Sequence, residues 1–479
     1  MREETRMTPD QLLSKYPAYE MEKIDRLLSE ALAGFHKKLI VLDDDPTGVQ
    51  TVHDIYVLTD YDVDSLKTAL KDEQRMFFIL TNSRSLSLDA TITMHREIAE
   101  NIAEAAKATG VEYVIISRGD STMRGHYPAE PEALREVLTE KYHQRVDGEI
   151  ICPFFAEGGR YTDENIHYLV DGGYLLPVGE SEFAKDKTFG YKSSHLGDWI
   201  EEKTNGCYKS ADVTYISIAE LRNVEIDAIC GKLMQINDFG KVVLNAVSYG
   251  DLKVFTIALY KAMAAGKTFL LRTAAGIVKI MGGNPDKPLL ERAELVNTTN
   301  QNGGLIVVGS HVSKTTAQLE RLHQCSFIQF VEINQHLVVD DEKFEAELKR
   351  VKTLTAEYIA KGITVAVYTR RDRFDLNTGS KEDELKMAVK ISDGVTSVVS
   401  DLSIRPNFII GKGGITSSEI GTKGLGVKKA LVMGQILPGI PVWLTGPESK
   451  FPDMPYVIFP GNVGSEDALK EAVEKMQVM

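Results

Sequence analysis

Acidic, arginine and hydroxyl side chains recur directly after short apolar runs in the first half of the chain. LDDDPTG (42–48) follows KLIVL, TNSRS (81–85) follows MFFIL, and SRGDSTMRGH (117–126) follows EYVII. Arginine is the natural bidentate partner of a carboxylate or a phosphate. An aspartate accepts hydrogen bonds from hydroxyls and can take a proton. This combination suits a small polyhydroxy acid as the ligand.

The side chains of these loops that could bind or react with such a ligand are Asp44, Asp45, Arg84, Asp120, Ser121, Thr122, Arg124 and His126. Taken singly, each could instead form a surface ion pair or a helix cap, and a hydrogen-bonding or capping role is the commoner one for a histidine such as His126. The repetition of the pattern after successive apolar runs favours a binding site.

A long polar stretch continues the first half. CPFFAEGGRYTDENIHY (152–168) supplies Arg160, a further candidate for substrate binding, and ESEFAKDKTFGYKSSHL (180–196) shows little periodicity. Long ordered loops of this kind are often lids or specificity elements. A mobile excursion without such a role is the alternative.

Glycine-rich turns in the second half indicate a phosphate site. They lie in VVGSHVSKTTAQLERL (307–322), FIIGKGGITSSEI (408–420) and FPGNVGSEDAL (459–469). A helix that starts after such a turn offers free N–H groups to an anion, with Ser310 or Ser313 as a possible cap and Thr416 and Glu419 at capping-box spacing. The nucleotide-binding candidates are Ser310, Gly411, Gly413, Gly414, Thr416, Gly461, Asn462 and Gly464. A glycine after a strand is often only a turn.

These loops need strands to position them. Short apolar runs alternate with helical patterns, which predicts α/β folding with mainly parallel sheets and ligands at the carboxyl ends of the strands. We expect an N-terminal helical extension (1–36), a first α/β domain (37–284) with strands near 38–42, 54–58, 76–80, 112–116 and 149–152, a polar linker (285–304) and a second α/β domain (305–479).

Composition excludes several classes of function. The net charge of −14 argues against nucleic acid as a partner. The four cysteines have no CxxC spacing, and no HxH or HExxH motif is present, so we predict no metal site of the protein's own. The absence of an apolar leader and of an apolar run of about 18 residues predicts a cytoplasmic protein without membrane association. AGKT (265–268) precedes a strand and is not a P-loop, and GxGxxG is absent after the first strand.

Together, the motifs resemble one known family. DDxTG, an SRS-type loop, DSTxRG, GSxxxxTxxQ, GGxTS and a terminal GNxG occur in this order over about residues 38–470. The chain is similar in this respect to the four-carbon acid sugar kinases, which include threonate, erythronate and 3-oxo-tetronate kinases. The family formerly counted as a domain of unknown function.

The resemblance implies ATP-dependent phosphorylation of a sugar acid, with Mg²⁺, in a cleft between an N-terminal acid-sugar domain and a C-terminal nucleotide domain. It places Asp44, Asp45, Arg84, Asp120, Ser121, Thr122 and Arg124 on the sugar-acid side, and Ser310, Gly411, Gly413, Gly414, Thr416, Gly461 and Gly464 on the ATP side. We expect Arg84 and Arg124 to clamp the substrate carboxylate and Asp45 or Asp120 to accept the hydroxyl proton.

Two positions depart from the family pattern. Ile415 stands where many members have an acidic residue, and Asp43 adds a carboxylate for which pairing with a basic side chain is the simpler role. Ile415 keeps open a non-catalytic sensor of nucleotide or sugar acid, and a kinase for a larger sugar acid is a further alternative. A lyase or dehydrogenase would need a metal triad or a dinucleotide fingerprint. A homodimer is only the default for a metabolic enzyme.

Overall fold

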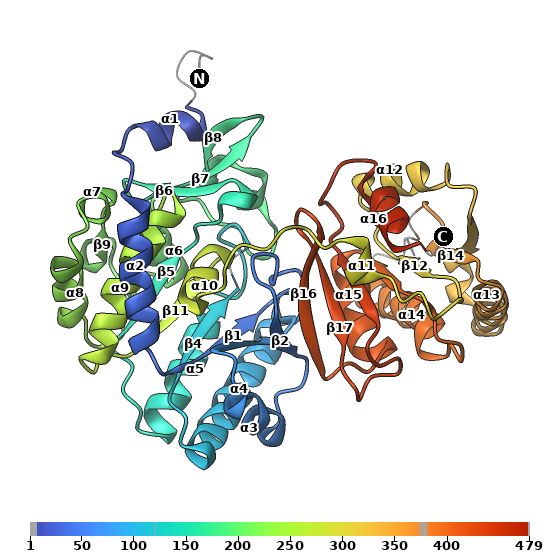
Figure 1. The fold of residues 1–479 in the computed structure, drawn as a ribbon, viewed down its shortest axis with the longest axis horizontal. Coiled ribbons are helices and arrows are strands. Elements are labelled where there is room, and N and C mark those ends of the chain that lie inside the picture. The colour runs from blue at the N-terminus through green and yellow to red at the C-terminus, as the bar shows by residue number, and fades with distance from the viewer. Residues whose placement is uncertain (1–6, 120, 373, 375–380, 478–479) are drawn as a thin grey trace. The chain divides into compact units, whose positions relative to one another are not determined.

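The computed structural model describes residues 7–119, 121–372, 374 and 381–477. Asp120, one of the two predicted catalytic residues, lies outside the described residues. The chain forms two compact units, one of residues 1–51 and 60–285 and the other of residues 52–59 and 286–479. Each unit combines helices with a mainly parallel sheet, which confirms the predicted α/β fold class (Figure 1).

The first unit is built on a parallel sheet with the strand order β3-β1-β4-β11-β5-β10-β9. The strands are β1 (Lys38–Asp43), β3 (Met76–Leu80), β4 (Tyr113–Arg118), β5 (Gly148–Cys152), β9 (Thr214–Ile216), β10 (Gly240–Leu244) and β11 (Phe269–Thr273). All residues of β1, β3, β5 and β11 are buried, as expected for parallel strands that are covered on both faces.

The first unit has ten α-helices among its described residues, most of which form two packed groups. They are α1 (Pro9–Ser14), α2 (Met21–Gly34), α3 (Val63–Lys71), α4 (Leu88–Thr109), α5 (Ala129–Glu136), α6 (Leu196–Lys203), α7 (Ile218–Arg222), α8 (Ile226–Gln235), α9 (Tyr249–Ala264) and α10 (Ala275–Gly282). α4 packs against both α3 and α5, whereas α2, α7, α8 and α10 surround α9. α9 is buried along most of its length, which explains its apolar composition all round.

Polar contacts of residues 15–20, which connect α1 to α2, hold the helical extension against the rest of the first unit. Tyr19 Oη donates to Asp251 Oδ1 at 2.8 Å, and the Arg222 guanidinium binds the same carboxylate and lies 4.6 Å from the centre of the Tyr19 ring. Tyr16 Oη donates to Asp163. The extension is therefore part of the packed unit.

The polar stretch 152–196 is more regular than its sequence suggests. It contains an antiparallel sheet of β6 (Arg160–Asp163), β7 (Ile166–Asp171) and β8 (Tyr174–Pro177). The expected loop over 152–168 was wrong for β6 and the start of β7, because the turn between them is made by Glu164 and Asn165, both with positive φ, and not by the glycine-containing pairs that usually mark a hairpin.

The second unit has a sheet with the strand order β13-β14-β12-β15-β18-β17-β16-β2, parallel from β13 to β18 and antiparallel beyond. The strands are β2 (Ile55–Leu58), β12 (Leu305–Val308), β13 (Ile328–Ile333), β14 (Thr364–Thr369), β15 (Ile409–Lys412), β16 (Lys429–Leu437), β17 (Ile440–Thr445) and β18 (Pro455–Phe459). The segment 52–59 thus leaves the first unit and supplies β2 to the second, where it pairs with β16.

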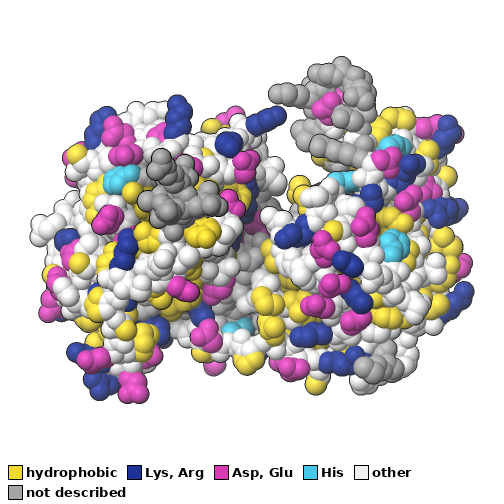
Figure 2. Space-filling view, turned by 90° about the horizontal axis from the view of Figure 1, so that it is seen from above, with side chains coloured by type: hydrophobic (Ala, Val, Ile, Leu, Met, Phe, Trp, Pro, Cys, Tyr) yellow, Lys and Arg dark blue, Asp and Glu magenta, His cyan; other side chains and the backbone are white. Residues whose placement is uncertain are grey.

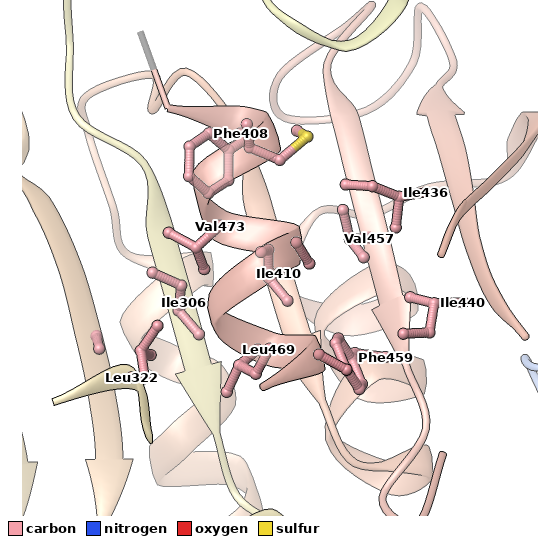
Figure 3. Packing of buried hydrophobic residues seen from close by; sticks show 14 of the residues in the cluster. Ile306, Leu322, Phe408, Ile410, Ile436, Ile440, Val457, Phe459, Leu469 and Val473 are labelled. Carbon is pink, nitrogen blue, oxygen red and sulfur yellow. The ribbon is translucent and has the colours of Figure 1, made fainter. Parts of the chain in front are cut away.

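The helices of the second unit are α11 (Arg292–Leu295), α12 (Ser313–Leu322), α13 (Asp341–Ala360), α14 (Lys381–Ser400), α15 (Gly414–Glu419) and α16 (Ala468–Met476). α16 places Leu469 and Val473 over Ile306 and Ile410 of the sheet (Figure 3). Leu290 and Leu295, from the polar stretch 285–304, are buried in the same core. That stretch is therefore packed against the second unit.

The surface of the described residues is mixed in charge. Figure 2 shows basic and acidic side chains interspersed over the visible face. Among the described helices, none combines the length and apolar character that a membrane crossing requires.

Candidate functional site

Three loops of the first unit begin at the same edge of its sheet. β1 lies between β3 and β4, and its last residue, Asp43, is level with Leu80 of β3 and Arg118 of β4. Thr81 N donates to Asp43 O at 2.8 Å, so the loop after β3 starts beside the triple aspartate. Parallel pairing thus brings the predicted acidic and arginine residues together. We refer to Asp43, Asp44, Asp45, Arg84, Arg118, Ser121 and Arg124 as the acid–arginine cluster.

Arg84 is the centre of this cluster. It lies in a 3₁₀ turn, Ser83–Ser85, and its Nε and Nη2 each donate to a different oxygen of Asp44 at 3.1 Å. Nη2 is also 2.9 Å from Asp45 Oδ2, and Nη1 donates to Ser121 Oγ at 2.7 Å. One guanidinium therefore holds two carboxylates and a hydroxyl from the other two loops.

Arg124 completes the cluster from the loop after β4. Its Nη2 donates to Ser121 Oγ at 3.0 Å, and its Nη1 is 3.1 Å from Asp186 Oδ2. Its guanidinium carbon lies 4.7 Å from the centre of the Phe183 ring. Asp186 and Phe183 belong to the polar stretch 180–196, which thus contacts the site.

The three aspartates differ in exposure and in charge. The Asp44 side chain is 2% exposed, and burial raises its pKa although Arg84 and Arg118 act in the opposite direction. The Asp45 side chain is 24% exposed. Burial acts to raise its pKa, but Arg84 and two hydrogen bonds from Thr47 outweigh this and lower it. Asp45 is therefore the carboxylate of the three that reaches solvent, and its surroundings favour its charged form.

Asp43 has a structural role. Its Oδ1 accepts a hydrogen bond from Arg118 Nη1 at 3.0 Å, as expected from its place outside the shared motif. A Cβ atom on Gly48 would lie 2.0 Å from Asp43 Oδ2, so the carboxylate fills the space that glycine leaves. Burial, more than the nearby Asp44 and Asp45, raises the pKa of Asp43 to about 7 despite Arg118.

A second layer supports the loops and was not found from the sequence. Arg272 Nη1 donates to Glu130 Oε2 at 2.8 Å, and its Nη2 donates to Arg124 O at 3.0 Å. A Cβ atom on Gly119 would lie 2.1 Å from Arg272 Nη1, so this glycine admits the guanidinium. Arg272 is the next-to-last residue of the apolar run TFLLRT, and an arginine within a buried strand was the available signal.

The other predicted residues of this unit are less central. Thr122 is buried with a φ of 57°, and its Oγ1 has no hydrogen-bond partner among the described residues. Arg160 lies in β6 with its guanidinium carbon 5.7 Å from the centre of the Phe155 ring. His126 Nε2 is 3.1 Å from Leu86 O, which fits the hydrogen-bonding role considered for it.

In the second unit the glycine turns converge on Ser310. A Cβ atom on Gly413 would lie 2.8 Å from Ser310 Cβ, and one on Gly461 would lie 3.2 Å from Ser310 Oγ. A Cβ atom on Gly309 would lie 2.3 Å from Thr416 Oγ1. We refer to Gly309, Ser310, Gly413, Thr416 and Gly461 as the glycine cluster. It brings together residues from all three predicted turns.

The expected caps at these turns were partly wrong. α12 has Val312 at its N-cap position without a side-chain cap, although Ser310 Oγ accepts from Val312 N at 3.4 Å. α15 has Gly413 at its N-cap, so Thr416 and Glu419 form no capping box. Glu419 instead accepts from Lys423 at 2.9 Å. Glycine conformations, which the spacing rule ignores, set where the helix starts.

Four of the predicted glycine-loop residues have other surroundings. A Cβ atom on Gly411 would meet Tyr456 Oη at 2.6 Å, and one on Gly464 would meet Ala468 Cβ at 2.5 Å, so both permit close packing. Gly414 is the first residue of α15, and Asn462 is exposed. Ile415, at the position of departure from the family, is 64% exposed.

Sequence reasoning missed two cations beside the glycine cluster. Arg371 Nη2 donates to Ser310 O at 2.6 Å and to Thr316 Oγ1 at 2.9 Å. Lys412 Nζ donates to Pro460 O at 2.5 Å and to Gly461 O at 3.1 Å. The describable part of the chain contains no group of three or more His, Cys, Asp or Glu residues arranged to hold a metal.

Comparisons with known proteins agree with an acid–arginine cluster in the first unit and a glycine cluster in the second. Residues 39–281 match a family model described as a sugar-binding N-terminal domain, and residues 305–469 match one described as a nucleotide-binding C-terminal domain. Among curated proteins, none matches the chain.

Solved structures share the fold at low sequence identity. A Haemophilus influenzae protein of the DUF1537 family is 17% identical with a TM-score of 0.61, and the match covers 90% of this chain and 98% of that one. A protein from Salmonella typhimurium LT2 is 16% identical with a TM-score of 0.62, covering 92% and 100%. These similarities support the fold. The chemistry of the site has to be inferred from the residues of this chain.

Proposed function

Because the chain belongs to the four-carbon acid sugar kinase family, with its sugar-binding N-terminal and nucleotide-binding C-terminal domains, we propose that it phosphorylates a terminal hydroxyl of a four-carbon sugar acid with ATP. The observation that carries this proposal is the acid–arginine cluster. There Arg84 holds Asp45 ionised and partly exposed, beside Ser121 and Arg124. A sugar acid needs both a cationic partner and hydroxyl acceptors, and this edge offers both.

Asp45 is the residue we assign to the acceptor hydroxyl. Its carboxylate would orient the hydroxyl and accept its proton as the new bond to phosphorus forms. A carboxylate with a lowered pKa is a weak base, so its main contribution is orientation. Asp120 stays a second candidate for the same role.

We assign the clamp on the substrate carboxylate to Arg84 and Arg124, which meet at Ser121 Oγ. Arg84 already spans Asp44 and Asp45, so its position is fixed before substrate binds. Asp44, Thr122 and Arg160 complete the proposed sugar-acid side. Fixed donors lower the entropy cost of orienting a small ligand.

The glycine cluster fits the nucleotide phosphates. Gly309, Gly413 and Gly461 let the three turns pack closely around Ser310 and Thr416. α12 starts beside Ser310 with N–H groups that no side chain caps, and such groups favour an anion. The Mg²⁺ that accompanies ATP is bound mainly by phosphate oxygens and water, so it enters as part of the substrate. Thr416, Gly411, Gly414, Asn462 and Gly464 remain proposed members of the nucleotide side.

A non-catalytic sensor is the second candidate, and exposed Ile415 favours it because an acidic residue is common at this position in the family. Coupled release of ADP across a panel of four- to six-carbon sugar acids separates the two. A kinase releases ADP only with its substrate. If the acids raise the melting temperature but none triggers ADP release, the sensor is correct.

A further inference from the structure

Lys412, the last residue of β15, is a fully buried lysine in the second unit, and no carboxylate among the described residues pairs with its side chain. Its relative exposure is 0%. Its Nζ donates to the carbonyl oxygens of Pro460 and Gly461 and lies 4.3 Å from the centre of the Phe459 ring. No described acidic side chain forms an ion pair with it. A buried ammonium without a counter-charge is unfavourable, so such a group is normally paired or loses its proton.

The ammonium lies directly behind the glycine cluster. Gly461 O accepts from Lys412 Nζ and also from Thr315 Oγ1, at 2.9 Å, in the first turns of α12. Gly413, the next residue in the chain, has a φ of 117° and faces Ser310. Lys412 therefore joins two of the three turns that surround Ser310.

We propose that Lys412 is the buried counter-charge for anionic nucleotide phosphates at the glycine cluster, and that it takes up a proton when they bind. The inference rests on the proposed function, since it requires that the second unit binds nucleotide. Phosphates at Ser310 would favour the charged form of a nearby ammonium, because opposite charges interact strongly where water is excluded. Protonated Lys412 in turn fixes the Gly461 carbonyl.

In the protein without nucleotide, the surroundings of Lys412 favour its neutral form, so the side chain can gain a proton when phosphates bind. Burial, and secondarily the charge of Lys314, lowers the pKa of Lys412 to about 7. At pH 8 Lys412 of the unbound protein would therefore be mostly neutral, whereas at pH 6 it would be mostly protonated. By linkage, nucleotide affinity should fall as pH rises above 7, by up to about tenfold per unit.

The contribution of Lys412 to the pH dependence must be distinguished from that of the other titratable or charged groups near it. Lys314, in the first turn of α12, and Arg371, which donates to Ser310 O, are further cations. Tyr456 is buried with its pKa raised well above the usual value, so it stays protonated. His311 Nε2 is 3.2 Å from Thr369 Oγ1, and a histidine ordinarily titrates near neutral pH. His311 is therefore the group that could imitate the effect.

The test is calorimetric titration of the full-length protein with ATP–Mg²⁺ at pH 6 and pH 8, in buffers of different ionisation enthalpy. We expect proton uptake per bound nucleotide to be small at pH 6 and to approach about one proton at pH 8. Lys412→Met, which keeps the length and apolar stem, should abolish this rise and weaken binding at pH 6 by at least about tenfold. His311→Gln and the exposed control Lys349→Met should keep the rise.

The outcomes distinguish the two proposals. If the wild-type protein binds no nucleotide, the proposed function fails and this inference falls with it. If it binds nucleotide without pH-dependent proton uptake, or if His311→Gln removes the uptake, only the role of Lys412 is overturned. Should Lys412→Met fail to fold, the uptake measured on wild type and His311→Gln decides the matter alone.

Discussion

Arg84 Nη2 lies 2.9 Å from Asp45 Oδ2 while the same guanidinium makes a two-point contact with buried Asp44. The buried carboxylate anchors the arginine, and the arginine in turn keeps the exposed carboxylate charged. The triple aspartate at the end of β1 therefore contains three different environments: Asp43 paired with Arg118, Asp44 as the anchor of Arg84, and Asp45 facing solvent.

Asp45→Asn should lower kcat by about 10² to 10⁴ while the protein stays folded, because a neutral amide orients the acceptor hydroxyl less well than a carboxylate and cannot accept its proton. Steady-state ADP release and the melting temperature provide the two readouts. Asp89→Asn, an exposed aspartate in the first turn of α4, is the matched control and should change neither. Unchanged turnover in Asp45→Asn would remove Asp45 from the site.

Arg84→Ala should cost about 3 kcal/mol of unfolding free energy in urea, because it leaves buried Asp44 without its main counter-charge. Arg96→Ala is the control, since Arg96 pairs with Glu136 at 2.7 Å but both side chains are more than 40% exposed. That pair should contribute less than about 1 kcal/mol. Equal losses in the two variants would show that the Arg84 pair is no more stabilising than a surface contact.

Stability should fall as the pH rises from about 4 to 7, in part through Asp43. Its pKa is raised from 3.8 to about 7, so between these values the folded state binds a proton that the unfolded state has released. The stabilisation is fully present below pH 4 and is lost as pH approaches 7, with a magnitude on the order of 4 kcal/mol.

Asp43→Asn should flatten this pH dependence, since asparagine stays neutral and can still accept from Arg118. Urea unfolding of both proteins at pH 5, 6 and 7 provides the comparison. Parallel stability curves for wild type and variant would rule out Asp43 as the titrating group.

Gly413→Ala should weaken nucleotide binding by at least about tenfold, which is about 1.4 kcal/mol. The added Cβ would lie 2.8 Å from Ser310 Cβ at a φ of 117°, so the turn must shift. Gly426→Ala is a matched control, because Gly426 also has a positive φ, 62°, but nothing lies within 4 Å of the added atom. We expect it to cost about 1 kcal/mol of stability and no affinity. Titration with ATP–Mg²⁺ gives both affinities.

Much of the fold could be read from the sequence because parallel strands are nearly continuous apolar runs. KLIVL, MFFIL and LIVV each became a fully buried strand. The hairpin β6–β7 was missed because its turn residues, Glu164 and Asn165, carry no glycine signal. β16 was missed because half-buried alternation in KALVMGQIL is a weaker pattern than a continuous run.

The site was partly predictable for a related reason. Loops after adjacent parallel strands must meet, which is why Asp44, Arg84 and Ser121 were found. Arg118, Arg272 and Lys412 were not found, because each is a charged residue at or next to the end of a strand, and only the packing shows which buried group it contacts. The sequence pattern therefore identifies the loops that carry the site, but not the buried side chains that hold those loops in place.

The excursion of residues 52–59 has a practical consequence for dissecting the protein. A cut at residue 285 would leave β2 covalently attached to the first fragment and would expose β16, whose backbone groups pair with β2 from Lys429 to Val432. An uncovered strand edge of this kind promotes aggregation. Residues 286–479 form one contiguous segment, but without β2 we do not expect them to be stable as an isolated domain. A soluble version would need the 52–59 segment, supplied as a separate peptide or joined to the domain by circular permutation.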